Sequence, residues 1–370
     1  MATAARRSAD LNSLYTTSIE KWMGSGSVEE TVFEANQLVW LLSKVAKETG
    51  TYGFEMVQPL MTTKNTGVGW FEYDDTLSTA SMQGAEAAKF DMAFLGGPIV
   101  ITEQEEIENA EPHRMVNVLK FKFDQLMLSL AEEVNLSGFR GSGTNSKSMD
   151  GLEDIVFAGD SGTTGVNPEL LTRAQASSGV DNTYGGITRT GTTGWENYSI
   201  ALDNNGQGDQ HWDGTGGGTF TDGAWQTLEN MYVYCSRGAI RPDLFLSGLN
   251  PYKDYHRLAT ANATYEKEID SFRGINLGHD NTKYRNAVWL YDETCVPHSD
   301  AGSDATTTLD MLYVLNSSYL KLCVESGYDF ALTPFQTPPD ARISIAHILW
   351  RGQLVCTNPR YQGVIFQYTV

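Results

Sequence analysis

The tetrapeptide GDSG at residues 159–162 is the most suggestive catalytic motif in this sequence. The same string surrounds the nucleophile of chymotrypsin-like serine proteases, in which a histidine activates the serine. The only histidine before Ser161 is His113, which falls in a predicted helix, and Thr163 stands where a second glycine is expected. We therefore interpret GDSG as a turn. A serine hydrolase using Ser161 is kept as an alternative function.

Patterns for metals and cofactors are incomplete. Asp203, Asn205, Gly208 and Asp209 follow part of a calcium loop, but Gly214 stands where a bidentate glutamate is needed, so only adventitious cation binding stays open. The histidines never occur at the spacing of metal ligands; they are His113, His211, His256, His279, His298 and His347. The cysteines form no C-x-x-C pair; they are Cys235, Cys295, Cys323 and Cys356. The sequence predicts reduced core thiols, no metal and no cofactor.

Charged and glycine-rich segments do not supply an active site either. The carboxylates at 74–75 and 103–106 lie at the predicted ends of elements, where they favour solvent or a helix N-terminus. The string GTGGG at 214–218 lacks the lysine and the strand–helix context of a phosphate-binding loop. The sequence therefore predicts a protein that is not an enzyme.

Length and charge limit the remaining possibilities. The chain has 370 residues, enough for two domains or for one domain with extensions. Its 26 basic and 46 acidic side chains give a net charge of -20, which argues against gripping nucleic acid but not against enclosing it. No run approaches the ~18 apolar residues of a membrane span, and no apolar stretch follows the arginines near the N-terminus. We expect a soluble chain made inside the cell, with no membrane partner.

Two apolar runs flank a polar segment in the first quarter of the chain. Residues 54–61 and 70–74 are rich in aromatic and apolar side chains, and residues 62–69 between them have turn chemistry. The runs predict a β-hairpin, whose apolar face needs a partner because a lone hairpin is only marginally stable. That partner is either a neighbouring subunit or the hairpin's own domain, and spacing leaves both open. The residues predicted to contact a neighbouring subunit are Phe54, Lys64, Trp70, Phe71 and Tyr73.

A long helix is predicted after a short strand. Residues 99–101 predict the strand, and Thr102 with Glu105 predicts a capping box. Pro112 suits the first turn of a second helix, which continues from His113 to about Ser137. Its apolar residues recur at helical spacing: Val116, Leu119, Phe123, Leu126, Leu130 and Val134. At ~1.5 Å per residue this helix spans on the order of 35 Å.

The rest of the chain mixes helices and strands. A polar arm and a helical pattern at 29–47 come first, and another predicted strand begins at Gly151 and Leu152. Further helices are predicted at 168–176, 222–238 and 251–261. Further strands are predicted at 244–246, 287–291, 309–316, 320–324, 343–350, 353–356 and 363–368. Residues 179–223, rich in Gly, Thr, Asn and Asp, predict an elaborated surface loop. The alternation indicates an α+β fold.

The order of these elements resembles that of the major capsid proteins of tailed bacteriophages, of the Hong Kong 97 type. The elements are a polar arm, a hairpin, the strand at Pro98, a long spine helix, a glycine loop and the strand at Gly151 and Leu152. Later segments look like landmarks of one phage coat subfamily: GGITRTGTTGW from 185, RPDLFL from 241, WLYD from 289 with CVP from 295, YVLN from 313 and GQLVCTNPR from 352. The resemblance covers nearly the whole chain from about Val28.

The resemblance implies an α+β, Hong Kong 97-like fold in four parts. These are an N-terminal arm at 1–50, an extended hairpin or E-loop at 51–80, a peripheral domain with the spine helix at 81–151 and 329–353, and an axial domain at 152–328 and 354–370 with an inserted loop near 203–222. The family offers no catalytic residues to carry over.

The resemblance also implies a function. It points to a head protein that self-assembles through hexamers and pentamers into an icosahedral shell, which encloses double-stranded DNA without sequence-specific binding. A separate scaffolding protein is expected, because no long coiled N-terminal region is visible, and portal and decoration proteins are further expected partners. The shell would be assembled in the cytoplasm of a bacterial host and form part of the virion. An encapsulin-like nanocompartment shell, built on the same fold for enzyme cargo, is the nearer alternative.

Overall fold

The computed structural model describes residues 38–368 with gaps. The longer gaps are 77–83, 142–146, 157–168, 171–182, 190–194, 204–223, 256–270, 277–281 and 296–310. The shorter gaps are 39–40, 43, 45, 66, 109–111, 250, 254, 273–274, 293 and 340–341. The chain divides into two compact units, which we call unit 1 and unit 2.

Unit 1 is built on a mixed sheet. It comprises Met1–Gly53, Met92–Gly151 and Lys321–Leu354. The strand order is β1-β15-β17-β16, and β4 also pairs with β17. The strands are β1 (Lys47–Gly50), β4 (Ala93–Thr102), β15 (Leu320–Glu325), β16 (Ala331–Leu332) and β17 (Ile343–Cys356). The ladder between β4 and β17 is antiparallel and extends from Ala93 opposite Gly352 to Thr102 opposite Ile343.

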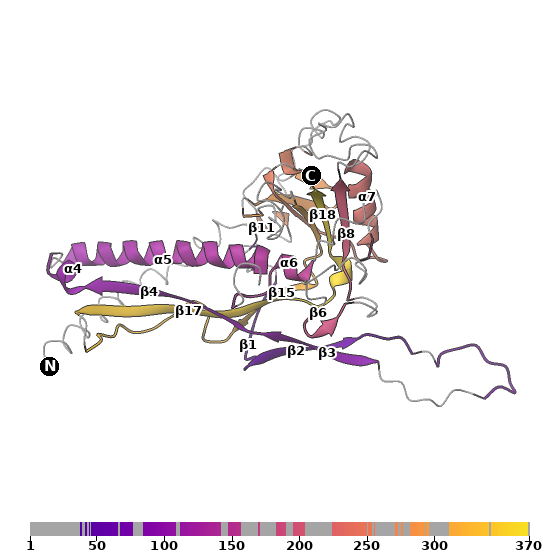
Figure 1. Ribbon diagram of the computed structural model, residues 1–370, viewed down its shortest axis with the longest axis horizontal. Coiled ribbons are helices and arrows are strands. Elements are labelled where there is room, and N and C mark those ends of the chain that lie inside the picture. Colours follow the sequence, from indigo (N-terminus) through magenta and orange to yellow (C-terminus); the bar gives the residue numbers. More distant parts are fainter. Residues whose placement is uncertain are drawn as a thin grey trace. The chain divides into compact units, whose positions relative to one another are not determined.

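The long helix α5 (Pro112–Arg140) covers one face of this ladder. Figure 1 shows α5 running alongside β4 and β17. Its inward residues Leu119, Phe123, Leu130 and Val134 are buried, as are Ile99 and Ile101 on β4. The approach is closest at Gly97, where an added Cβ would lie 2.3 Å from Leu126 Cδ1. The predicted spine helix is therefore confirmed, with Pro112 as its first residue. Within the part of the chain that the structure describes, no helix has the length and apolar character needed to cross a membrane.

The short helix α4 (Glu103–Glu108) begins with the predicted capping box. The backbone N–H of Thr102 donates to Glu105 Oε2 at 3.1 Å, and the backbone N–H of Glu105 donates to Thr102 Oγ1 at 3.3 Å. Lys122 Nζ lies 2.6 Å from the same Glu105 oxygen and also donates to the Val100 carbonyl at 2.8 Å. The hydrogen bond from Lys122, helped by the backbone of Thr102, holds the pKa of Glu105 below its usual value. One carboxylate therefore links α4 to α5.

Unit 2 contains a second, larger sheet. It comprises Phe54–Asp91, Leu152–Leu320 and Val355–Val370. The strand order is β12-β13-β9-β14-β18-β8-β5. The strands are β5 (Glu169–Leu170), β8 (Tyr198–Asp203), β9 (Leu244–Ser247), β12 (Thr282–Tyr284), β13 (Ala287–Tyr291), β14 (Met311–Leu315) and β18 (Gly363–Tyr368). Strand β18 pairs with both β14 and β8, so the sheet is complete only when the last strand of the chain is in place.

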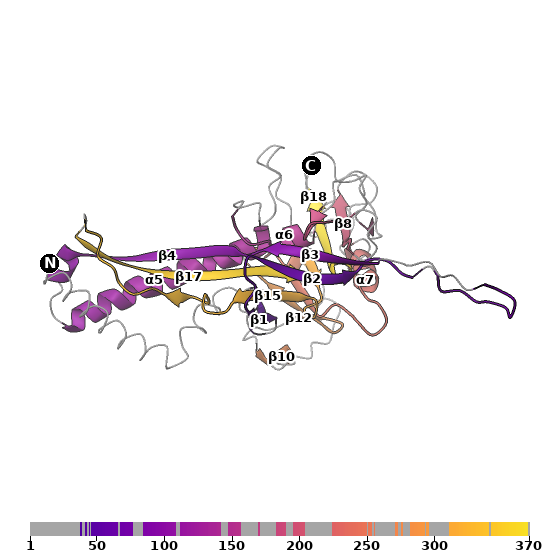
Figure 2. The same ribbon diagram turned by 90° about the horizontal axis from the view of Figure 1, so that it is seen from below.

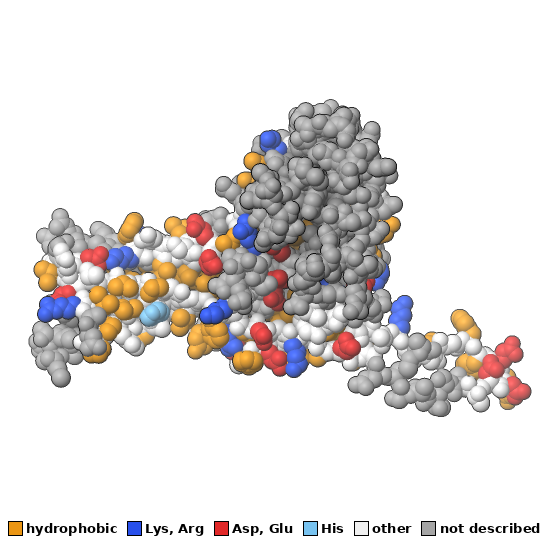
Figure 3. All heavy atoms as spheres, viewed as in Figure 1, with side chains coloured by type: hydrophobic (Ala, Val, Ile, Leu, Met, Phe, Trp, Pro, Cys, Tyr) orange, Lys and Arg blue, Asp and Glu red, His pale blue; other side chains and the backbone are white. Residues whose placement is uncertain are grey.

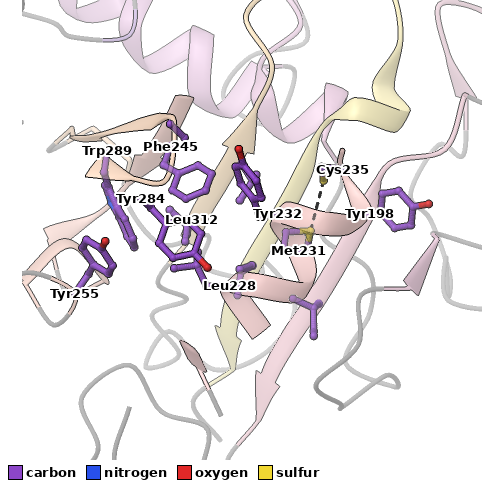
Figure 4. Packing of buried hydrophobic residues seen from close by; sticks show 14 residues of the cluster. Tyr198, Leu228, Met231, Tyr232, Cys235, Phe245, Tyr255, Tyr284, Trp289 and Leu312 are labelled. Carbon is purple, nitrogen blue, oxygen red and sulfur yellow. Dashed lines mark hydrogen bonds between the residues drawn. The ribbon is translucent and has the colours of Figure 1, made fainter. Parts of the chain in front are cut away.

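Helix α7 (Ala224–Tyr234) packs on this sheet over an aromatic core. Figure 4 shows the buried cluster, with Tyr232, Phe245, Tyr284 and Trp289 in contact. The rings of Phe245 and Trp289 are 5.6 Å apart, and those of Phe245 and Tyr284 are 5.8 Å apart. The indole N–H of Trp289 donates to Ser247 Oγ at 2.7 Å, so its polar atom is satisfied inside the core.

The remaining elements are short. They are helix α6 (Leu152–Ile155), the 3-10 helix η3 (Pro359–Tyr361) and the strands β2 (Glu55–Met61), β3 (Ala85–Asp91), β6 (Thr183–Tyr184), β7 (Ile187–Thr188), β10 (Ser271–Phe272) and β11 (Ile275–Asn276). The pairs β2–β3, β6–β7 and β10–β11 are each antiparallel.

Three local predictions are wrong. The chain enters α6 at Leu152 rather than a strand, and an added Cβ on Gly151 would lie 2.3 Å from the backbone nitrogen of Gly141. Glu169–Leu170 forms β5, inside the range predicted as a helix. The two strands predicted at 343–350 and 353–356 are the single strand β17, because Arg351 and Gly352 continue its pairing with β4.

The prediction of a surface loop at 179–223 is wrong for its described residues. Tyr184, Trp195 and Tyr198 are buried, and β8 lies inside the larger sheet. Arg189 is buried as well; it donates to Asn197 Oδ1 at 2.8 Å and to the carbonyls of Asp154 and Ile155. Burial lowers the pKa of this guanidinium. Residues 204–223, which include most of the predicted insertion, lie outside the described residues, as do residues 1–37 of the predicted arm.

Candidate functional site

The hairpin formed by β2 and β3 is the candidate functional site. Its register pairs Glu55 with Asp91 and Met61 with Ala85. The second strand is therefore Ala85–Asp91, whereas the prediction placed it at 70–74; those residues lie in the connecting loop and form no strand. Lys89 Nζ lies 3.2 Å from Glu55 Oε1 across the exposed face of the pair. The hairpin thus extends to Asp91, beyond the predicted limit of 80.

The base of the hairpin is packed within unit 2. Met56, Ala88 and Phe90 are buried on one face, because successive side chains of a strand alternate between its two sides. The Phe90 ring lies 5.1 Å from the ring of Tyr184, and the backbone N–H of Lys89 donates to the Gly185 carbonyl at 2.9 Å. This face therefore has its partner within the same chain.

The Phe90 ring packs against a tight turn at Gly185. Gly185 has a φ of +58°, and a Cβ there would lie 2.8 Å from the Phe90 ring. Tyr184 is fixed in turn, since its hydroxyl accepts the backbone N–H of Cys356 at 2.8 Å and its carbonyl accepts the indole N–H of Trp195 at 2.9 Å. The landmark segment that begins at Gly185 thus anchors the hairpin base.

The loop of the hairpin is built differently. Two of its described turns are closed by local bonds: Gly67 N–H donates to Asn65 Oδ1 at 2.8 Å, and Glu72 N–H donates to Asp75 Oδ2 at 2.9 Å. In Figures 1 and 2 the described part of the loop extends beyond the ends of β2 and β3. Figure 3 shows acidic and hydrophobic side chains together at its far end. The loop therefore carries apolar groups that its own fold does not cover.

All five predicted contact residues are exposed. The relative exposures of the aromatic ones are 85% for Phe54, 105% for Trp70, 63% for Phe71 and 105% for Tyr73, and Lys64 is exposed as well. The structure brings Trp70, Phe71 and Tyr73 together in one short segment, whereas Phe54 lies in the turn immediately before β2. The prediction missed other exposed apolar residues of the hairpin: Val57, Met61 and Val68. The alternation of Val57 and Met61 along β2 could have identified these two, whereas Val68 lies in the loop.

A second exposed apolar surface lies in unit 1, on the face of β4 and β17 that faces away from α5. Cross-strand neighbours share a face, so Phe94 lies beside Arg351, and Val100 beside Ile345. Phe94 is exposed, while Val100 and Ile345 are half-buried. Figure 3, which views α5 and the sheet from the side, shows hydrophobic side chains at the level where Figure 1 places these strands.

The residues considered for catalysis do not form a site within the described part of the chain. No group of His, Cys, Asp and Glu side chains there could hold a metal ion. Ser161, the side chain of His113 and residues 205–214 of the calcium-like loop lie outside it. All four cysteines are buried. Burial raises the pKa of Cys323 to about 11 and that of Cys356 to about 12, so neither thiol supplies a nucleophilic thiolate near neutral pH.

Solved structures match this architecture over most of its length. The Cyanophage A-1(L) capsid asymmetric unit matches at 14% identity over 88% of this chain and 91% of that chain, with a TM-score of 0.52. The capsid of a native GTA particle matches at 9% identity over 89% of this chain and 90% of that chain, with a TM-score of 0.53. The holo-SrpI encapsulin complex from Synechococcus elongatus PCC 7942 matches at 9% identity over 88% and 86% of the two chains, with a TM-score of 0.49.

These likenesses concern the fold. No protein-family model matches the chain, and no curated protein is close enough in sequence to count as a match. The chain has the α+β fold of Hong Kong 97-type capsid proteins, with the long spine helix in α5, as the sequence predicted.

Proposed function

We propose that this chain is the major capsid protein of a tailed bacteriophage, which self-assembles through hexamers and pentamers into an icosahedral shell around double-stranded DNA. The carrying observation is the hairpin loop, which exposes Trp70, Phe71 and Tyr73 on a chain with a capsid fold. The hairpin base is packed within the subunit and the loop is not, which fits a protein whose exposed apolar loop is covered by another copy of the same chain.

The energetics favour this use of the loop. Each large aromatic side chain buries roughly 150–250 Å² when it is covered. At about 25 cal/mol per Å² of apolar surface, covering Trp70 and Phe71 on an adjacent subunit stabilises each contact by several kcal/mol. Closed symmetry repeats the same contact at every copy. We propose that Phe54, Lys64, Trp70, Phe71 and Tyr73 make this contact.

The two compact units are proposed to serve as the two domains of a capsid subunit. Unit 1 carries α5 and the β4–β17 ladder, which suits the peripheral domain with its spine helix. Unit 2 carries the larger sheet, which suits the axial domain, and one division between the units falls between Gly151 and Leu152. This assignment rests on the order of elements and on the likeness of fold.

The net charge of -20 supports a shell that encloses DNA without binding it tightly, because negative charges on the protein do not attract the phosphates of DNA. The proposed partners are further copies of the chain, a separate scaffolding protein, a portal and decoration proteins. The proposed location is the virion, after assembly in the bacterial cytoplasm.

The test is assembly of the chain co-expressed with its scaffolding protein. Sedimentation and negative-stain electron microscopy should show closed shells of uniform size, and only monomers or dimers would overturn the proposal. The contents of particles isolated from infected cells decide between the two kinds of shell. Nuclease-protected double-stranded DNA supports the phage head, whereas a single packaged enzyme and no DNA supports the encapsulin-like alternative.

A further inference from the structure

One arginine of β17 contacts the chain on both sides of the hairpin. The Arg351 guanidinium donates to the carbonyl of Gly53, and it lies over the ring of Phe94 at 4.7 Å from the centroid. Gly53 is the last residue of unit 1 before the hairpin segment Phe54–Asp91, and Phe94 follows soon after that segment ends. A single side chain of unit 1 therefore contacts the chain where it leaves for the hairpin and where it returns.

A buried carboxylate completes this arrangement. Glu325 Oε2 accepts the backbone N–H of Tyr52 at 3.0 Å and lies 3.6 Å from Arg351 Nη1. The side chains of Glu325 and Arg351 are only 9% and 13% exposed, so the charges are poorly screened by water. Both are fixed by their strands, since the Arg351 N–H donates to the Tyr328 carbonyl at 3.0 Å and Glu325 is paired with Gly50.

The backbone conformation of Gly53, where the chain leaves unit 1, makes a restraint from Arg351 effective. Gly53 has a φ of +68°, a left-handed conformation that side chains other than glycine rarely adopt. Its carbonyl direction is thus set by a residue with wide conformational freedom, and the bond from Arg351 restricts that freedom. The contact on Phe94 uses the flat face of the guanidinium, while the bond to Gly53 uses its edge. A lysine ammonium cannot supply both at once.

The stability of unit 1 alone does not account for this arginine. Arg351 Nε is buried and makes no hydrogen bond within the described residues. A buried donor without a partner is costly, and apolar residues of similar size often replace buried ion pairs without loss of stability. An arginine here is explained by its contacts: its terminal nitrogens contact the Gly53 carbonyl and Glu325, and its flat face contacts the Phe94 ring.

We infer that Arg351 and Glu325 form a clamp on the two ends of the hairpin segment, and that Arg351 is a positioning residue for the assembly contact. With Gly53 and Phe94 held by one guanidinium, the hairpin is presented to a neighbouring subunit with little freedom at its root, which lowers the entropy lost on docking. The assembly part of this inference rests on the proposed function. The clamp itself concerns the isolated subunit.

The test compares Arg351→Met and Arg351→Lys with Arg342→Met. Arg342 is a matched control, because it immediately precedes β17, is exposed, pairs with Glu103 at 3.5 Å and has no contact with Gly53 or Phe94. Hydrogen–deuterium exchange of the full-length subunit should become at least about fivefold faster at 50–56 and 91–95 in Arg351→Met, while α5 and the far part of β17 stay protected. Arg351→Lys should be intermediate, and Arg342→Met should match the wild type at these positions.

The assembly measurement completes the test. Shell yield should fall at least about tenfold in Arg351→Met, with a melting temperature close to that of the control. Unchanged exchange at 50–56, or exchange that rises equally throughout unit 1 in both Arg351 variants, would overturn the clamp. Faster local exchange with a normal shell yield would overturn the positioning role. If the wild-type chain forms no shells, the proposed function fails, and the exchange result still decides on the clamp.

Discussion

Two aromatic groups of unit 2 are similar in composition and opposite in environment. Tyr232, Phe245, Tyr284 and Trp289 are buried between α7 and the larger sheet, whereas Trp70, Phe71 and Tyr73 are exposed in the hairpin loop. The first group is covered as soon as the chain folds. The second is covered only if another molecule supplies the surface, so the same kind of side chain serves folding in one place and, by our proposal, assembly in the other.

Truncation in the buried group should give the largest effect on stability. Phe245 is fully buried and touches three other rings. Phe245→Ala should lower the free energy of unfolding of the subunit by roughly 3–5 kcal/mol, because it removes transfer energy and leaves a cavity. Urea denaturation followed by circular dichroism measures this. A loss below about 1 kcal/mol would mean that the aromatic core does not determine the stability of unit 2.

Truncation of the loop aromatics should leave the stability of the subunit nearly unchanged and should reduce shell formation. Trp70→Ser combined with Phe71→Ser should leave the free energy of unfolding within about 0.5 kcal/mol of wild type, because neither side chain is buried in the subunit. Shell formation should be largely lost, since each contact loses several kcal/mol of apolar burial. Particle counts by electron microscopy, set beside the urea curves, measure both. Intact shells from the double variant, or a variant subunit that unfolds, would contradict the intersubunit assignment.

The elements that the sequence predicted well are those set by local pattern. The periodicity of α5 and the Thr102–Glu105 capping box are each readable within a short window, and both are present. The strand β18 was predicted with its observed bounds, because Val364, Ile365 and Phe366 are strong strand formers followed by an alternating end.

The elements that were missed depend on distant partners. Strand β3 reads AEAAKFD, which has little strand propensity, and it forms where Phe90 meets Tyr184 and where Lys89 bonds to Gly185. Strand β8 was read as part of a polar loop, yet it pairs in parallel with β18 near the end of the chain. No local window contains these partners. For the candidate site, the sequence predicted that the apolar residues of the hairpin need a partner, but it did not predict that the base packs within unit 2 while the aromatic residues of the loop stay exposed.

Burial of thiols gives a pH-dependent effect of intermediate size. Cys356 is fully buried, and burial raises the pKa of its thiol to about 12 in the folded subunit. In the unfolded chain the thiol ionises near pH 8.5, so the folded state loses stability as the pH rises above that value. Between pH 8 and pH 10 this thiol should contribute a loss of about 2 kcal/mol. Urea denaturation at the two pH values measures it, with Cys356→Ala as the variant that should lose less; an equal loss in both would assign the effect to other groups.

The smallest predicted effect is the loss of the Thr102 cap, which tests whether an exposed residue outside the hairpin loop affects assembly. Thr102 is exposed like the loop aromatics, but its hydroxyl accepts the Glu105 backbone N–H at the start of α4. Thr102→Ala should cost the subunit about 1 kcal/mol through loss of the cap, whereas shell yield should not fall by more than this stability loss explains. Thr102→Ser keeps the hydroxyl and should restore most of the stability. If Thr102→Ala instead abolished shells while leaving the urea curve unchanged, the surface near α4 would belong to an assembly contact in addition to the hairpin loop.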